Sequence, residues 1–248
     1  MDEHFAQGNS VLHRRNPKVK IIGAASFILV CATTGSFTVA AASLITGIAF
    51  FILAKLPFLL VLKRLLAVNT FTFFLWLTLP FTYGGGELVT TLGLSLSLKG
   101  VQLAALITLK TNAIVLCLIA LLGTSRIVNI GHALESLHFP EKLCFILLFS
   151  YRYVFVIYQE YQRLARAARM RCFVPATTIH TYRTFGYLFG MTLIKSWNRA
   201  TRVHQAMVLR GFNGKLIPLS EDIYTREDTF FLSIIVTLSF ALSMLNLL

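Results

Sequence analysis

Charged residues are scarce in this sequence. Lys, Arg, Asp and Glu together make up 13% of the 248 residues, about half of their share in an average soluble chain. Apolar residues make up 56%, and the mean hydropathy is +0.72, which excludes an intrinsically disordered chain. Basic residues exceed acidic ones, 23 to 10; in so apolar a chain, this excess is typical of loops beside anionic lipid rather than of a nucleic-acid surface. The composition predicts an integral membrane protein that lies in a lipid bilayer and binds no nucleic acid.

Sequence motifs for catalysis and metal binding are also missing. The four cysteines contain no CxxC pair, so we expect neither a zinc or redox site nor a disulfide framework. The six histidines show no HxxxH spacing, which argues against metal ligands. A Walker A motif, a GxSxG elbow and a dinucleotide-binding fingerprint are all absent. We therefore expect a non-catalytic chain that binds no metal or cofactor directly.

Long uncharged runs predict the fold. No charged residue lies between 21 and 54, a run of 34, whereas one membrane-spanning helix needs about 20 residues. This run predicts two short spans joined by a turn at 33–36. The expected fold is all-α: a polytopic membrane protein with about five transmembrane helices and a helical cytoplasmic domain. Three further spans are expected over 65–81, 99–123 and 229–248. The predicted domains are a cytoplasmic N-terminal segment (1–20), a four-span region (21–123), a cytoplasmic helical region (124–228) and a C-terminal transmembrane helix (229–248).

The distribution of basic residues predicts the orientation. Basic clusters precede the first span and follow the second, and the positive-inside rule then places the N-terminus in the cytoplasm. Five crossings leave the C-terminus outside. The segment 143–158 is apolar, but it carries Arg152 and is followed by four arginines that a crossing would place outside. We therefore interpret it as a buried or interfacial helix on the cytoplasmic side.

Lys110 lies midway along the fourth expected span, where a charge costs about 3 kcal/mol on insertion scales. A lysine paired within the helix bundle accounts for this position, and a contact with a partner protein is the alternative.

A strongly basic region covers 161–220, which contains ten Lys or Arg and no Asp or Glu. This region contains a repeat with an offset of 39 residues. Each copy has Arg, Ala and Arg at i, i+4 and i+8, on one face of a helix, and ends with Arg, a small residue and Phe. The matching residues are Arg163, Ala167, Arg171 and Phe173 in the first copy and Arg202, Ala206, Arg210 and Phe212 in the second.

A duplicated basic helix end suggests a partner with two equivalent pockets, in which a guanidinium pairs with a carboxylate. Gly211 suits a helix C-cap, so the second copy is expected to be better terminated than the first. The alternative is that these arginines only set the membrane topology and lie against lipid headgroups.

The sequence AMVLRGF, from Ala206 to Phe212, resembles the AMxxRG(F/Y) signature of the T component of energy-coupling factor (ECF) transporters. The sequence AARMRCF, from Ala167 to Phe173, is similar to the first of that family's two Ala-Arg-Gly-type motifs, with Met170-Arg171-Cys172 in place of Ala-Arg-Gly. The segment 13–20 is similar to HRLDPRxK, with Asn16 in place of Asp, and 96–100 is similar to LSxEG. The resemblance covers roughly residues 5–245 and leans toward the cobalt/nickel branch, the CbiQ type.

The resemblance implies a role and a set of partners. A T component is a coupling subunit that holds a substrate-binding membrane subunit (S component) and docks on two cytoplasmic ABC ATPases, which bind the ATP and Mg. The protein would then lie in the cytoplasmic membrane of a prokaryote, with cobalt or nickel as the cargo. Arg171 and Arg210 would insert into grooves on the two ATPases. Their implied neighbours at the docking sites are Ala167, Met170, Cys172, Ala206, Leu209 and Gly211, and the implied supporting basic residues are Arg163 and Arg202.

Two other functions remain as alternatives. A membrane-integral enzyme acting on a lipid or phosphate substrate at the cytoplasmic face could use the arginines for anion binding, but 161–220 supplies no carboxylate for its chemistry. A scaffold bound to anionic lipid would need no specific arginine, and high salt would release it.

Overall fold

The computed structural model describes all residues except 1–7, 9, 83–86, 92–93, 215–223 and 248. The described residues form eight helices and one short β-hairpin, and they divide into two compact units. Unit 1 comprises 1–133 and 221–248, and unit 2 comprises 134–220. The expected all-helical membrane fold is confirmed. The hairpin was not predicted from the sequence.

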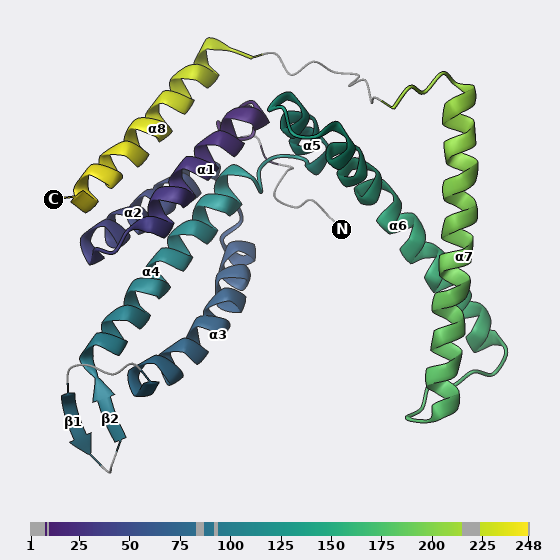
Figure 1. The fold of residues 1–248 in the computed structure, drawn as a ribbon, viewed down its shortest axis with the longest axis horizontal. Coiled ribbons are helices and arrows are strands. Elements are labelled where there is room, and N and C mark those ends of the chain that lie inside the picture. The colour runs from purple at the N-terminus through teal and green to yellow at the C-terminus, as the bar shows by residue number, and fades with distance from the viewer. Residues whose placement is uncertain (1–7, 9, 83–86, 92–93, 215–223, 248) are drawn as a thin grey trace. The chain divides into compact units, whose positions relative to one another are not determined.

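Unit 1 contains five long helices and the hairpin (Figure 1). In chain order the elements are α1 (Pro17–Thr33), α2 (Phe37–Ala54), α3 (Phe58–Thr82), β1 (Glu87–Thr91), β2 (Leu94–Ser97), α4 (Leu98–Leu121) and α8 (Arg226–Leu247). The strands pair antiparallel, with Thr91 opposite Leu94. Val and Thr are common in β1, and such β-branched residues favour extended backbone. The short helix α5 (Ile127–Ser136) runs from unit 1 into unit 2.

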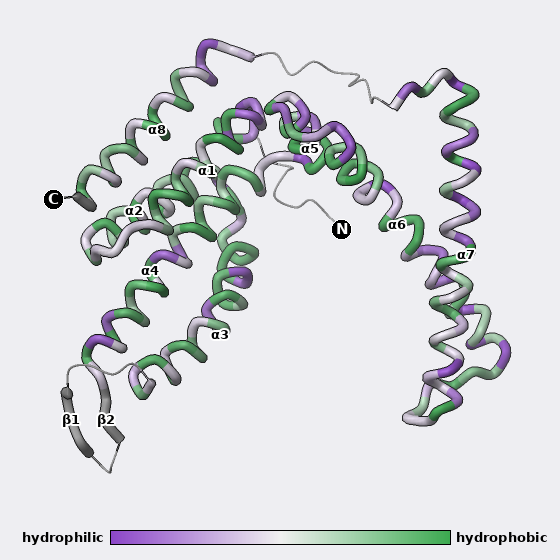
Figure 2. Tube along the Cα trace, in the orientation of Figure 1, coloured by the Kyte–Doolittle hydropathy of each residue, from purple (hydrophilic) through white to green (hydrophobic). Residues whose placement is uncertain are grey.

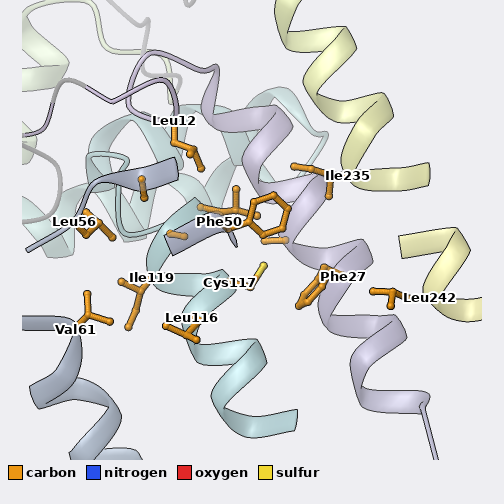
Figure 3. Close-up of a cluster of buried hydrophobic side chains, with 14 of the residues drawn as sticks. Leu12, Phe27, Phe50, Leu56, Val61, Leu116, Cys117, Ile119, Ile235 and Leu242 are labelled. Carbon is orange, nitrogen blue, oxygen red and sulfur yellow. The ribbon is translucent and has the colours of Figure 1, made fainter. Parts of the chain in front are cut away.

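The hydrophobic core of the described residues lies in unit 1, between α1, α2, α3, α4 and α8 (Figure 3). Phe27 of α1 meets Phe50 of α2 edge to face, with their ring centroids 6.3 Å apart. Helices also approach closely at glycine. A Cβ on Gly47 of α2 would lie 3.1 Å from the carbonyl oxygen of Ala113 in α4. Small residues of this kind let helix backbones pack without a hydrophobic driving force from water.

The turn expected at 33–36 is confirmed, because α1 ends at Thr33 and α2 begins at Phe37. Lys110 of α4 binds the residues at this turn and so keeps the turn in contact with the helix bundle. Its Nζ donates hydrogen bonds to the carbonyl oxygens of Ala32, at 3.3 Å, and Thr34. These carbonyls belong to the end of α1, where helical partners run out. Lys110 is therefore paired within the bundle, and its partners are backbone carbonyls.

Among the described residues, five helices are long and apolar enough to cross a membrane: α2, α3, α4, α8 and the long helix α6 (Glu141–Met170). The number agrees with the expectation, but the set differs. The 17-residue α1, expected as the first span, is not among them, whereas α6 includes the segment 143–158 that was placed at the interface. Because these assignments rest on length and composition alone, the interfacial position of 143–158 stays a prediction.

Many large apolar side chains of unit 1 point outward rather than into the core. Phe71, Phe73 and Phe74 of α3, and Ile45 and Ile52 of α2, are all exposed. Figure 2 shows long apolar stretches along α2, α3, α4 and α8. An exposed apolar surface of this extent is stable in lipid rather than in water.

Unit 2 consists mainly of α6 and α7 (Ile179–Leu209), with 30 and 31 residues. At 1.5 Å per residue each helix is about 45 Å long. The helices run in opposite directions, because the end of α6 packs near the beginning of α7 and the end of α7 packs near the beginning of α6.

Candidate functional site

The two copies of the repeat both lie at the C-terminal end of a long helix. The helix α6 ends at Met170 and α7 ends at Leu209, so Arg171 and Arg210 are the residues that cap the two helices. Their backbone angles are similar, with φ −94° and ψ 29° for Arg171 and φ −91° and ψ 10° for Arg210. The repeat in the sequence is therefore a repeat in structure.

The backbone hydrogen bonds at the two ends also match. The amide of Phe173 donates to the carbonyl of Ala168 at 3.2 Å, and the amide of Phe212 donates to that of Met207 at 3.0 Å. A second bond runs from the amide of the residue after each arginine. The amide of Cys172 donates to the carbonyl of Arg169 at 3.1 Å, and the amide of Gly211 donates to that of Val208 at 3.0 Å. This pair of bonds is the Schellman motif, which satisfies carbonyls that a helix end leaves without partners.

The Schellman motif needs a residue with positive φ directly after each arginine. Gly211 supplies φ 80°, as expected for a C-cap glycine. Cys172 adopts φ 61° at the equivalent position, although this region is disfavoured by about 1–2 kcal/mol for a residue with a Cβ. The first copy is thus terminated with the same geometry as the second, and the two differ in backbone strain.

An exposed apolar residue stands beside each exposed arginine. Met170 is 85% exposed and Leu209 is 88% exposed. Arg171 and Arg210 are exposed as well. We call these two ends the tips: the first tip is 167–173 and the second is 206–212. Each tip presents a cation next to an apolar side chain, a combination that suits a groove with apolar walls and a carboxylate.

The phenylalanine of each tip packs on the other helix. The ring of Phe173 meets Phe185 of α7, with centroids 5.8 Å apart. The ring of Phe212 meets Phe145 of α6 at 5.6 Å, and Phe145 in turn stacks on Phe149 at 4.3 Å. These ring contacts join each tip to the other helix of unit 2.

A carboxylate lies where the two helices cross. Glu160 of α6 is 7% exposed, and its Oε1 accepts a hydrogen bond from Nζ of Lys195 in α7 at 2.6 Å. Its Oε2 lies 3.3 Å from Nη1 of Arg163 and 3.9 Å from Nη2 of Arg199. Three basic side chains therefore share one acid, and two of them come from the other helix.

Sequence reasoning missed Glu160, although a signal was present. The residue stands immediately before the region 161–220, which has no acid at all. A lone carboxylate at the edge of such a region is a candidate partner for several of its basic residues. Arg163, expected as a supporting basic residue of the docking site, pairs with this carboxylate.

Unit 2 also exposes apolar side chains. Phe189, Leu193 and Trp197 of α7 are exposed, and a mostly apolar groove of about 510 Å³ lies between α6 and α7, with Phe149 and Trp197 in its lining. In the part of the chain that the structure describes, no three His, Cys, Asp or Glu side chains gather where they could hold a metal ion. The surface of unit 2 thus offers cationic and apolar contacts.

Comparison with known proteins identifies the family. The family model of CbiQ, a cobalt transport protein, matches residues 8–219. An uncharacterized protein of Methanocaldococcus jannaschii is 25% identical over 224 residues, which is 86% of this chain and 81% of the relative. The energy-coupling factor transporter transmembrane protein EcfT of Listeria innocua is 23% identical over 221 residues, 85% of this chain and 83% of the relative.

A shorter match is to the nickel permease LarQ of Lactiplantibacillus plantarum, which is 34% identical over 84 residues, 34% of this chain and 30% of the relative. The matches agree with the resemblance that the two arginine motifs carry. Because the family model covers most of its length, this multi-pass membrane chain belongs to the CbiQ family of cobalt transport proteins.

Proposed function

We propose that this chain is the energy-coupling transmembrane subunit of an ECF-type ABC importer. It links two cytoplasmic ATPases, which bind ATP and Mg, to a substrate-binding membrane subunit, and the cargo is cobalt or nickel. The chain itself catalyses no reaction. The family and the relative named EcfT support the subunit type, and the relative named nickel permease supports the cargo.

The observation that carries the proposal is the equivalence of the two tips. Each places an arginine at the same position of the same Schellman motif, beside an exposed apolar residue. A pair of like ATPases offers two like grooves, and a single chain needs two like tips to fill them. Arginine suits this task because its planar guanidinium pairs with a carboxylate through two hydrogen bonds.

The spacing of the tips fits two separate grooves. Arg171 lies eleven residues beyond Glu160, and Arg210 lies fifteen residues beyond Lys195. At 1.5 Å per residue, the tips stand about 16 Å and 22 Å from the crossing, along helices of opposite direction. Closure of the ATPase pair then moves the C-terminal end of α6 and the C-terminal end of α7. Glu160 keeps the two helices in contact where they cross during that movement.

The exposed apolar side chains of unit 2 suit the third partner. Exposure of these side chains to water is unfavourable, so an apolar membrane subunit or the bilayer covers them. They are Phe189, Leu193 and Trp197. Movement of α6 and α7 is thereby passed to the substrate-binding subunit. The N-terminus and both tips lie on the cytoplasmic side in this arrangement, and the C-terminus lies outside. No observation favours the alternative of an enzyme acting on a lipid or phosphate.

Affinity purification of the tagged chain from its native membrane tests the proposal. We expect the wild-type chain to bring two ATPase subunits and a small apolar membrane protein, and the variant Arg171→Glu/Arg210→Glu to bring the membrane protein alone. The matched control is Arg183→Glu, an exposed arginine of α7 outside both tips, which should retain the ATPases. A wild-type chain that comes out alone under mild detergent and low salt overturns the proposal.

The cargo is tested separately, by uptake of radioactive cobalt and nickel into cells with and without the chain. We expect uptake of one of the two ions to depend on the chain and on both tip arginines. Equal uptake in both strains would remove cobalt and nickel as cargo while leaving the coupling role to the purification experiment.

A further inference from the structure

Two connections join unit 2 to the rest of the chain, and the unit 1 end of each lies beside the start of α1. The outgoing connection follows α4 and includes Thr124 and Ser125, and the returning connection enters α8 at Thr225. The N-terminal motif 13–20 approaches both of them. We call this group of contacts the junction cluster; its members are Arg15, Asn16, Lys20, Thr124, Ser125, Thr225, Glu227 and Asp228.

Lys20 holds the outgoing connection. Its side chain is among the most buried in the protein, at 1% exposure. Its Nζ donates hydrogen bonds to Oγ of Ser125 at 2.8 Å and to Oγ1 of Thr124 at 3.3 Å. Thr124 in turn donates its hydroxyl to carbonyls in the last turn of α4, at 3.0 and 3.1 Å. The ammonium group of α1 is thus bonded to the first residues that leave α4.

Asp228 holds the returning connection. Its Oδ2 accepts hydrogen bonds from the amide and the hydroxyl of Thr225, at 3.1 and 2.8 Å. The carboxylate in the first turn of α8 thus reaches back to the N-cap amide, which is one half of a capping box. The other oxygen, Oδ1, accepts a bond from the amide of Asn16 at 3.3 Å and lies 3.8 Å from Nη1 of Arg15. One carboxylate therefore both starts α8 and ties it to the start of α1.

Glu227 adds a second link between the same two segments. Its Oε2 lies 2.6 Å from Nη1 of Arg15, and Asn16 itself caps α1 by accepting a bond from the amide of Lys18 at 3.0 Å. Arg15 lies 212 residues from Glu227 in the chain, and Asn16 lies 212 residues from Asp228. Asp228 is 2% exposed, whereas Glu227 is largely exposed, and burying a carboxylate such as that of Asp228 is unfavourable unless it is paired. Their pairing at this one place fixes both connections to the same helix end.

We propose that Lys20 and Asp228 are positioning residues for energy coupling: they fasten the outgoing and returning connections of unit 2 to the start of α1, so that movement of unit 2 moves α1 and α8 together. This inference rests on the proposed coupling function. Neither residue lies in a tip, so neither is needed for ATPases to bind. A purely structural role would instead lower the amount of folded protein and leave coupling intact in what remains.

Hydrogen exchange of the assembled complex separates these roles. The complex is purified with its ATPases, and exchange is measured by mass spectrometry with and without MgATP and vanadate, which trap the closed ATPase pair. In the wild type we expect nucleotide to change exchange at the tips, in peptides covering 167–173 and 206–212. We also expect a change at the junction, in peptides covering 122–127 and 224–230.

The variants are Lys20→Met, which removes the ammonium group at similar length, and two milder changes, Ser125→Ala and Asp228→Asn. We expect each to retain the ATPases and the nucleotide-dependent change at the tips, and to lose the change at the junction. The matched control is Lys18→Met, a half-buried lysine two residues earlier on α1, which should behave as wild type. The milder variants keep the test valid if Lys20→Met fails to fold.

Each outcome decides one question. Loss of the junction change with the tip change intact supports the inference. A junction change that persists in all three variants overturns it, as does a wild-type complex whose tips respond to nucleotide while its junction does not. A wild-type complex whose tips do not respond at all contradicts the proposed function itself, and so the two failures are distinguishable.

Discussion

Unit 1 and unit 2 are both built from long helices, yet they bury very different side chains. In the described residues, the core of unit 1 joins five helices through apolar side chains such as Phe27, Phe50 and Leu116. In unit 2, the buried residues of α6 and α7 are Cys144, Glu160, Thr181 and Thr192. Unit 1 is held by an extended apolar interface, whereas unit 2 is held by one shared carboxylate and a few aromatic contacts.

The difference suits two tasks. A membrane bundle that must stay assembled gains from many apolar contacts, because each atom pair contributes little and their sum is large. A pair of helices that passes on a movement gains from a small number of specific contacts, because these fix the crossing and leave the rest of each surface for partners. The predictions below test whether each unit depends on the contacts assigned to it.

The largest effect is expected in the core of unit 1. Replacing the fully buried Phe27 by Ala should lower the free energy of unfolding by about 3 kcal/mol, because it removes the ring contact with Phe50 and leaves a cavity. Denaturant unfolding in detergent measures the change. Leu29→Ala is the control: this residue lies on the same helix and is 65% exposed, so a change under about 0.5 kcal/mol is expected. Equal effects at the two positions would contradict the assigned core.

The next effect separates the two tips of unit 2. Arg171→Glu and Arg210→Glu, made singly, should each weaken binding of one ATPase by on the order of a hundredfold, because each reverses the charge that meets a carboxylate. Native mass spectrometry of the purified complex should then show one ATPase in place of two for either variant. Loss of both ATPases from one single variant, with no effect of the other, would show that the tips are not equivalent.

A smaller effect is expected at the crossing. Glu160→Gln should reduce cobalt or nickel uptake about tenfold while both ATPases stay bound, because the helices no longer move as a pair. Lys195→Met should have a similar effect, and the double variant should be no worse than either single one, since both changes break the same 2.6 Å contact. Additive losses would indicate that the two residues act independently.

The smallest effect compares the caps of the two tips. Cys172→Gly should raise the free energy of unfolding by about 1 kcal/mol, because glycine adopts the positive φ of this position without strain. Gly211→Ala should lower it by about the same amount, because φ there is 80°. The same unfolding measurement applies. A stabilising Gly211→Ala would contradict the assigned geometry.

The long apolar runs predicted most of unit 1, because a membrane-spanning helix needs little more than length and apolar side chains. The turn at 33–36 followed from the length of the run, which is enough for two spans, and from the turn-forming residues at 33–36. The helix α1 begins at Pro17, with Asn16 as its N-cap, four residues before the uncharged run that predicted the first span. Because Lys18 and Lys20 lie in this part of the helix, the absence of charge could not show where the helix begins. Burial of Lys20 was not predictable, since its partners Ser125 and Thr124 lie more than a hundred residues away.

The candidate site was predictable where the chain repeats itself. The two arginines, and the glycine after the second, follow from the 39-residue offset. Positive φ at Cys172 does not, because nothing in a cysteine favours it; the Schellman bonds from the amides of Cys172 and Phe173 require it. The role of Glu160 was also hidden, since a sequence shows which charges exist and not which of them share a partner.

The ring contacts of the tips have a mechanical consequence. The first tip is braced on the beginning of α7 through Phe173, and the second is braced on the beginning of α6 through Phe212. A force applied at either end is therefore borne by both helices, and neither end can be displaced alone without breaking an aromatic contact. An importer built on such a pair should respond to its two ATPases as one motor, so that disabling one of them would stop transport rather than halve it.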